Sequence, residues 1–205
     1  MYFNKQEIEK LERIKRLNII NSIAGIRPAN LIGTSKNNTS NLAIFSSVMH
    51  LGSSPALMGF ILRPEGDVKR NTYDNIKANG VFTINHVPLN KISNSHATSA
   101  KFPESVSEFK HCGFKEQWLD TFDAPFVKES PLKIGLSYIQ SIPIEINNTS
   151  LIVGQVEHLF VAKDKISEEG YIDLESTNST GVSGLNSYYQ LKKVNSFPFA
   201  RFNDS

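Results

Sequence analysis

Apolar residues in the first third of the chain occur in short runs, with polar segments between them. The runs Ala29–Thr34 and Ala56–Leu62 have the length and the flanking residues of buried β-strands. Between them, the turn-forming residues of Thr34–Asn41 predict a polar loop, and Leu42–Val48 mixes apolar with small hydroxyl residues. We therefore expect two buried strands joined by a long polar segment.

Further strands are expected in the middle and later parts of the chain. Val81–Val87 alternates apolar and polar residues, as a half-buried strand does. Leu132–Ile146 and Leu151–Val161 form the clearest predicted hairpin, with a turn at Asn147–Asn148. The pattern thus predicts a mainly β protein.

Glycine interrupts four of the predicted strand positions, at Gly33, Gly59, Gly135 and Gly154. Glycine weakens a strand and commonly marks a bulge, a bend or a close approach of another group to the backbone. We expect one of these features at each position.

An amphipathic helix is predicted near the N-terminus, over Lys5–Leu17. Its apolar residues have helical spacing, and Lys and Glu occupy the other face. Such a helix is expected to pack on the rest of the fold or on a partner subunit. The residues that form its apolar face are Ile8, Leu11, Ile14 and Leu17.

Three shorter helices are expected between the strands. Asn71 or Thr72 is positioned to cap a helix over Tyr73–Asn79. Leu89–Phe102 is predicted to begin as a helix and continue as a loop, and Pro103–Lys115 contains a short helix.

Hydroxyl and basic residues in this framework are candidates for binding. Ser46 and Ser47 occupy strand positions where a buried hydroxyl needs a partner, and that partner is either a ligand or backbone at a bulge. Arg63, Lys69 and Arg70 precede the predicted helix, whose free N–H groups favour an anion. Residue types alone favour a solvated basic turn over an anion site.

Composition places the chain among globular proteins, as one domain over residues 1–205. Of its 205 residues, 40% are hydrophobic and 20% charged, and the formal net charge of +2 gives no argument for nucleic acid. Cys112 is the single cysteine, which suits a reducing, cytoplasmic environment. The chain has no long apolar run, so we expect neither export nor membrane insertion.

Several familiar motifs are absent from the sequence. It has no G-x-G-x-x-G, G-x-x-x-x-G-K-[ST], H-E-x-x-H or C-x-x-C segment. A nicotinamide nucleotide, if used, is therefore not expected in a Rossmann domain. His111 and Cys112 have no suitably spaced partners, so no metal site is predicted.

An ordered set of segments resembles the flavin reductase-like family, which has the FMN-binding split β-barrel fold. The family pattern is a T-T/S strand end, N-x-A-x-x-S, a strand begun by Pro, and a basic residue followed by D-T-x-x-N-I. The chain departs from it at Asn71, where the family usually has Asp. Matching segments are Gly33–Ser35, Ser40–Val48, Pro55 and Arg70–Ile76, with later matches at Phe82–Val87 and Gly184–Tyr189.

The resemblance implies a mainly β fold, a split, Greek-key antiparallel barrel with peripheral helices. It also implies an oxidoreductase that transfers hydride from NAD(P)H to bound FMN, with FAD as the alternative flavin. The protein would be a homodimer, because split barrels usually complete the flavin pocket with a second subunit. A flavin-binding or electron-carrier protein without catalysis is the main alternative, followed by a cofactor-free or haem-binding module.

The same resemblance assigns roles to particular residues. His96 would contact the hydride donor, within a polar cluster that also contains Thr98, Ser99 and Lys101; a solvated helix histidine is the alternative. Thr34, Ser35, Arg63, Arg70 and Thr72 would hold the phosphate, and Asn71 is a further cofactor-binding candidate. Asn41, Leu42 and Ala43 would offer backbone and amide groups to the ring edge, which Ser46 and Ser47 would complete.

Overall fold

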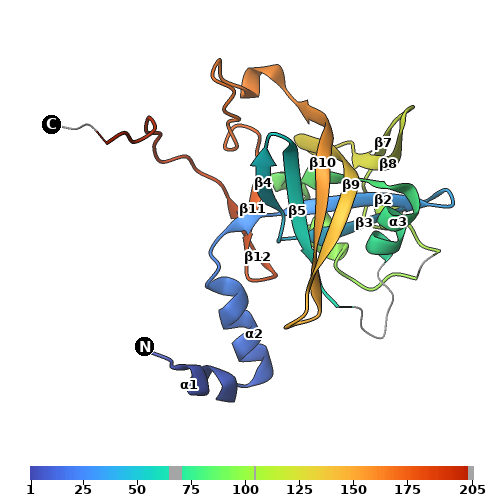
Figure 1. The fold of residues 1–205 in the computed structure, drawn as a ribbon. Coiled ribbons are helices and arrows are strands. Elements are labelled where there is room, and N and C mark those ends of the chain that lie inside the picture. The colour runs from blue at the N-terminus through green and yellow to red at the C-terminus, as the bar shows by residue number, and fades with distance from the viewer. Residues whose placement is uncertain (65–70, 104, 203–205) are drawn as a thin grey trace.

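A curved antiparallel sheet forms the centre of the molecule (Figure 1). The computed structural model describes residues 1–64, 71–103 and 105–202. Among these residues the sheet has seven strands, in the order β3-β2-β6-β9-β10-β5-β4. They are β2 (Asn30–Lys36), β3 (Thr39–Phe45), β4 (Met49–Ser53), β5 (Ala56–Leu62), β6 (Val81–His86), β9 (Leu132–Ile144) and β10 (Thr149–Val161).

Two smaller sheets and several short helices surround the central sheet. One small sheet joins β1 (Arg27–Pro28), β11 (Thr180–Ser183) and β12 (Ser187–Gln190), and the other pairs β7 (Glu116–Leu119) with β8 (Phe122–Val127). The helices are α1 (Lys5–Lys10), α2 (Arg13–Ser22), α3 (Asn71–Asn79), η1 (Leu89–Lys91), α4 (Ile92–Ala97), α5 (Glu108–His111) and η2 (Lys163–Lys165).

Strand β2 is buried on both of its faces. Leu31 belongs to an apolar cluster with Leu42 and Phe109, whereas Ile32 belongs to a second cluster with Phe60 and Ile84. Successive side chains of a strand point to opposite faces, so one strand connects both cores. This explains why the run Ala29–Thr34 is apolar without alternation.

The predicted polar loop Thr34–Asn41 is instead a tight hairpin between β2 and β3, so this prediction is wrong. Strand β2 continues to Lys36, and β3 already begins at Thr39. Asn37 and Asn38 have φ angles of 50° and 62° and form the two-residue turn. Asparagine tolerates this left-handed conformation, and such turns match the twist of paired strands.

The strand glycines lie where neighbouring groups come close. A Cβ atom at Gly33 would lie 2.3 Å from the Pro125 carbonyl oxygen and 2.6 Å from Thr83 Oγ1. At Gly154 it would lie 2.6 Å from Cζ of Phe82, and the β9–β10 register shifts between Val153 and Gly154. The expected close approaches and bulge are therefore confirmed at these two positions.

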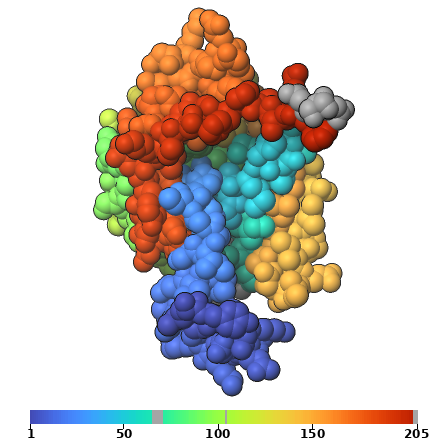
Figure 2. Space-filling view, turned by 90° about the vertical axis from the view of Figure 1, so that its left-hand side faces the viewer, coloured from blue at the N-terminus to red at the C-terminus, as the bar shows by residue number. Residues whose placement is uncertain are grey.

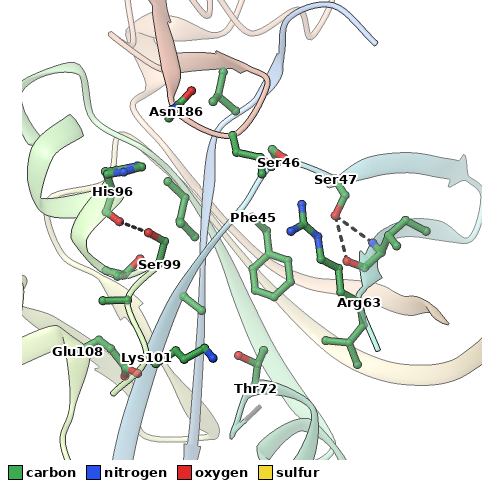
Figure 3. Close-up of a pocket in the computed structure, with 18 of the residues that line it drawn as sticks. Phe45, Ser46, Ser47, Arg63, Thr72, His96, Ser99, Lys101, Glu108 and Asn186 are labelled. Carbon is green, nitrogen blue, oxygen red and sulfur yellow. Dashed lines mark hydrogen bonds between the residues drawn. The ribbon is translucent and has the colours of Figure 1, made fainter. Parts of the chain in front are cut away.

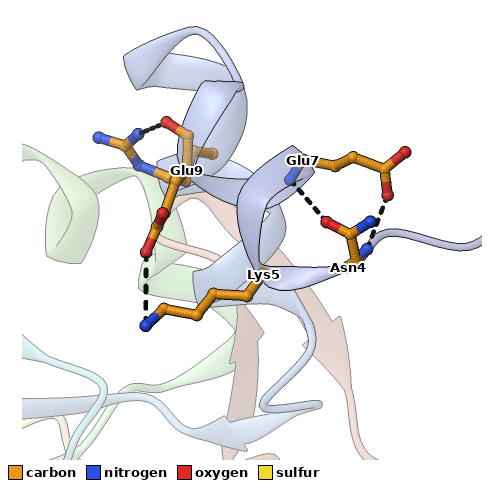
Figure 4. A network of polar contacts seen from close by, with 5 residues as sticks. Asn4, Lys5, Glu7 and Glu9 are labelled. Carbon is orange, nitrogen blue, oxygen red and sulfur yellow. Dashed lines mark hydrogen bonds and ion pairs between the residues drawn. The ribbon is translucent and has the colours of Figure 1, made fainter.

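The prediction of one continuous helix over Lys5–Leu17 is wrong, because the structure has two helices there. Glu12 breaks the predicted helix by accepting hydrogen bonds from the Ile14 and Lys15 N–H groups, and so caps α2. In α1, Asn4 and Glu7 exchange reciprocal capping bonds (Figure 4). Lys5 pairs with Glu9 at 3.9 Å along the same exposed helix.

Neither N-terminal helix buries a residue in this chain. Both helices project from the body of the molecule (Figures 1 and 2), and the C-terminal segment after β12 also extends away from it (Figure 1). That segment has an exposed aromatic end at Phe197, Phe199 and Phe202. Of the apolar face predicted for Lys5–Leu17, Ile8, Leu11 and Leu17 are partly buried and Ile14 is exposed.

Most other predicted elements are confirmed. The β9–β10 hairpin turns at Asn147–Asn148, and the helix stopped by Gly80 is α3. The sequence did not predict β4, the β7–β8 pair or the β11–β12 pair. No helix among the described residues is long and apolar enough to cross a membrane.

Candidate functional site

A pocket of about 760 Å³, lined by both polar and apolar side chains, opens beside β3 (Figure 3). Its walls come from β3, β5, the start of α3, the segment around α4, and the β11–β12 hairpin. Its volume lies within the range of about 300–1,000 Å³ that is usual for small-molecule sites. Eight of the twelve residues with a predicted role line it, namely Asn41, Ala43, Ser46, Ser47, Arg63, Asn71, Thr72 and His96.

Asn41 and Thr72 meet in this pocket although 31 positions separate them. The Asn41 Nδ2 atom donates to Thr72 Oγ1 over 3.4 Å, and both residues are buried. Asn41 lies on β3, whereas Thr72 lies in the first described turn of α3 together with Asn71. The amide and the hydroxyl that the sequence assigned to one site therefore adjoin.

Ser47 is held by the backbone of the neighbouring strand. Its hydroxyl donates to the Ile61 carbonyl oxygen at 3.2 Å and accepts from the Ile61 N–H at 3.1 Å. This is the backbone-bonded alternative expected for a hydroxyl in a strand. Ser46 also lines the pocket, and Arg63 lies on the same side as Ser47 in Figure 3.

Three residues with a predicted role do not line the pocket. The Thr34 hydroxyl accepts from Asn75 Nδ2 at 3.1 Å, and the Ser35 hydroxyl donates to the Asp123 carbonyl oxygen at 2.5 Å. Leu42 packs in a core cluster, and its backbone N–H donates to Glu108 Oε2 at 3.1 Å. Their polar groups thus serve the fold. Arg70 and Lys69 lie outside the described residues.

His96 is an exposed side chain on α4, at the far side of the pocket from Arg63 (Figure 3). Its Nδ1 atom lies 2.9 Å from the Tyr188 hydroxyl on β12, and the two rings pack edge to face. Burial raises the pKa of Tyr188, so its hydroxyl keeps its proton at neutral pH. Thr98, Ser99 and Lys101 of the predicted polar cluster line the same pocket.

Glu108 is a pocket residue that the sequence did not single out. It is 6% exposed, and its carboxylate accepts the Leu42 N–H. Burial raises the pKa of this carboxyl group. It also raises the pKa of the Cys112 thiol, with Glu108 adding to the effect, so Cys112 is an inert apolar residue of the core.

Arg27 is a second pocket residue without a predicted role. Its Nη2 group donates to the carbonyl oxygens of Gly184 at 2.9 Å and Asn21 at 3.3 Å. Arg27, Arg63 and Lys101 give the pocket three cations, against the single carboxylate of Glu108 among the described lining residues. The pocket therefore favours an anionic ligand.

The lining side chains offer the kinds of group that a phosphorylated aromatic ligand requires. Phe45 and Phe102 offer aromatic surface suited to a flat ring. Asn41 and Ser46 offer polar groups suited to a ring edge, and Arg63 offers a cation suited to a phosphate. The described residues contain no group of three or more His, Cys, Asp or Glu side chains that could hold a metal ion.

Comparison with known proteins agrees with this geometry. Residues 26–178 match the model of the flavin reductase-like domain. The chain belongs to the flavin reductase-like family. This membership confirms the predicted family and supports a flavin-utilising, oxidoreductase-type function.

Two similar proteins match most of the chain. A proposed flavin reductase with a split barrel domain from Shewanella frigidimarina is 39% identical, with a TM-score of 0.93 over 98% of this chain and 100% of its own. A protein of Methanothermobacter thermautotrophicus is 32% identical over 149 residues, which are 71% of this chain and 68% of that protein.

The predicted fold class is confirmed as well. Component B of nitrilotriacetate monooxygenase from Bacillus cereus is only 17% identical but has a TM-score of 0.84, over 96% of this chain and 98% of its own. Together with the Shewanella structure and the antiparallel sheets, this likeness identifies the fold as a mainly β split barrel.

Proposed function

We propose that this flavin reductase-like protein is an FMN-dependent oxidoreductase that passes hydride from NAD(P)H to flavin. The observation that carries the proposal is the pocket in which Asn41 bonds to Thr72 and which Arg63 and His96 also line. Residues assigned to the phosphate, the ring edge and the hydride donor thus share one cavity. FAD is the alternative flavin, and titration with each flavin separates the two.

The proposed binding roles follow the chemistry of the pocket. Arg63 would pair with the phosphate by charge-assisted hydrogen bonds, and Asn71 and Thr72 would add neutral donors at the start of α3. Arg70 stays a predicted phosphate ligand from the sequence alone. Asn41, Ala43 and Ser46 would contact the ring edge, where donors stabilise negative charge on the ring.

The cofactor, when bound, supplies the two-electron acceptor, and the net reaction is NAD(P)H + H⁺ + FMN to NAD(P)⁺ + FMNH₂. The protein's part is to bind and to orient the reactants. His96 would contact the nicotinamide nucleotide. The Tyr188 hydroxyl, 2.9 Å from His96 Nδ1, would hold the imidazole ring in place.

The first test is reduction of the bound flavin in the absence of oxygen. We expect purified protein loaded with FMN to lose its yellow absorbance when NADH or NADPH is added. Stopped-flow absorbance near the flavin maximum measures the rate, and FMN without protein is the control. Protein that binds FMN but leaves it oxidised would instead be a flavin carrier, the alternative expected from the sequence.

A second prediction concerns the phosphate end of the pocket. The substitution Arg63→Ala is expected to raise the Kd for FMN by about 10- to 100-fold, because a hydrogen bond to a charged group contributes about 1.5–3 kcal/mol. Fluorescence titration of FMN measures this change. Arg13→Ala, on the exposed face of α2, is the matched control. Equal affinities for Arg63→Ala and wild type would remove Arg63 from the phosphate site.

The homodimer and the cytoplasmic location stay predictions. Exposed apolar side chains on α2, including Ile14 and Ile20, and the aromatic C-terminal end are consistent with a surface that a second copy covers. Light scattering would then report twice the 22.9 kDa mass of the chain.

A further inference from the structure

The pocket has a second cationic wall, which the proposed FMN ligands do not use. Arg27 lies on β1, where it pairs with Val182 of β11, and both residues line the pocket. Its guanidinium donates to the carbonyl of Gly184, at the turn between β11 and β12. The same wall includes Asn186, which Figure 3 shows on the opposite side of the pocket from Thr72.

Within the described part of the chain, no acidic side chain pairs with Arg27. Both of its hydrogen-bond acceptors are neutral carbonyl oxygens. Its Nε atom is buried and has no hydrogen-bond partner in the described structure. Because Arg27 lines the pocket and its known acceptors are neutral, its guanidinium charge is suited to an anion that enters the pocket.

The neighbours of Arg27 suggest which anion this is. Tyr188, two residues from Asn186 on the same hairpin, bonds to His96, the residue proposed to contact the hydride donor. The Arg27 wall thus belongs to the half of the pocket assigned to the second substrate, while Arg63 belongs to the half assigned to FMN. A nicotinamide nucleotide carries two phosphates in its pyrophosphate, and arginine is well suited to phosphate oxygens.

We propose that Arg27 binds the pyrophosphate of NAD(P)H, in a subsite separate from the FMN phosphate site. This inference rests on the proposed function, because it takes the donor to be a nicotinamide nucleotide. It adds the residue that anchors the donor and the group that this residue binds. Since NADH and NADPH share the pyrophosphate, Arg27 would serve both donors equally.

The test compares charged and uncharged hydride donors. Arg27→Gln protein loaded with FMN is expected to show a KM for NADH and for NADPH raised at least about 10-fold, the loss typical of a charged hydrogen bond. N-benzyl-1,4-dihydronicotinamide has no phosphate, so its KM should stay within about twofold of wild type. Arg27→Lys should recover part of the affinity, and Arg13→Gln is the surface control.

The remaining outcomes would overturn the inference. An equal rise in KM for the uncharged donor would mean that Arg27 acts by holding the Gly184 turn. A loss of FMN affinity would place Arg27 in the flavin site. A change for NADPH alone would point to its additional phosphate.

Equilibrium binding separates this inference from the proposed function. Calorimetric titration of FMN-loaded protein with NAD⁺ needs no turnover. Wild type that binds NAD⁺ at least about 10-fold more tightly than Arg27→Gln supports the subsite, even if no donor reduces the flavin. In that case the proposed reductase activity fails while the Arg27 subsite stands. Equal NAD⁺ affinity, or no binding by wild type, would overturn the subsite.

Discussion

Replacing Asn85 with alanine is expected to lower the free energy of unfolding by about 3 kcal/mol. The side chain is fully buried on β6, and its three hydrogen bonds reach β2, β8 and Thr83 of its own strand. Its Nδ2 group donates to the Leu31 carbonyl at 3.1 Å and to Thr83 Oγ1 at 2.8 Å, and its Oδ1 atom accepts the Val127 N–H at 2.9 Å.

The expected cost comes from groups left unpaired in the core. Each buried polar group that loses its partner costs about 1–3 kcal/mol, and the Val127 N–H loses the partner it has here. The network also includes Thr83, whose hydroxyl donates to the Pro125 carbonyl at 2.7 Å. It therefore ties β8 to β6 and β2, and β2 in turn supports β3 at the pocket.

Urea unfolding measures this loss, and two further variants identify its cause. Asn85→Leu keeps most of the volume but removes the hydrogen bonds, so it should destabilise the protein about as much as Asn85→Ala. Asn18→Ala, on the exposed surface of α2, should change stability by no more than about 0.5 kcal/mol. Recovery of wild-type stability by leucine would show that cavity formation, not hydrogen bonding, explains the loss.

The elements that the sequence predicted best are those with strong local signals. Strand β5 has the predicted bounds Ala56–Leu62, and the β9–β10 hairpin turns at the predicted asparagines. Long apolar runs and turn residues determine such elements with little help from tertiary structure. In contrast, β11 and β12 have four residues each, and β11 also pairs with β1, which is far away in the sequence.

The site prediction did not take account of the alternation of side chains between the two faces of β3. The sequence assigned Asn41, Leu42 and Ala43 together, through their backbone and amide groups, but it did not separate their side chains, which point to alternate faces of β3. Asn41 and Ala43 line the pocket, while Leu42 enters the core. Once β3 is known to begin at Thr39, this alternation follows, so the missing information was the hairpin register.

Glu108 and Arg27 were missed for another reason. Each becomes a pocket residue only because a distant segment folds next to it: β3 for Glu108 and the Gly184 turn for Arg27. An isolated glutamate in a short helix, or an arginine before a proline, carries no local signal of such a contact. These two residues required the tertiary structure, whereas the Asn41–Thr72 pair could be inferred from an ordered family motif.

Lowering the pH from 7 to 4 is expected to remove about 3 kcal/mol of stability through His86 alone. This residue ends β6, and its Nδ1 atom lies 3.0 Å from the Ser179 hydroxyl. Burial lowers the pKa of His86 from 6.5 to about 4, because the charged imidazolium loses its hydration. The difference between these two values corresponds to about 3 kcal/mol of free energy.

The sign follows from proton binding in the two states. Between pH 6.5 and about 4 the unfolded chain binds a proton at His86 that the folded chain does not, so acid favours unfolding. Stability from this residue is fully present above pH 6.5 and falls as the pH decreases through that range. His86→Gln, which has no titrating ring, should lose correspondingly less stability on acidification.

Urea unfolding of wild type and His86→Gln at intervals from pH 7.5 to 4 measures this difference. Carboxyl groups titrate in both proteins, so subtracting one curve from the other isolates His86. Parallel curves would mean that the imidazole is solvated in the folded state.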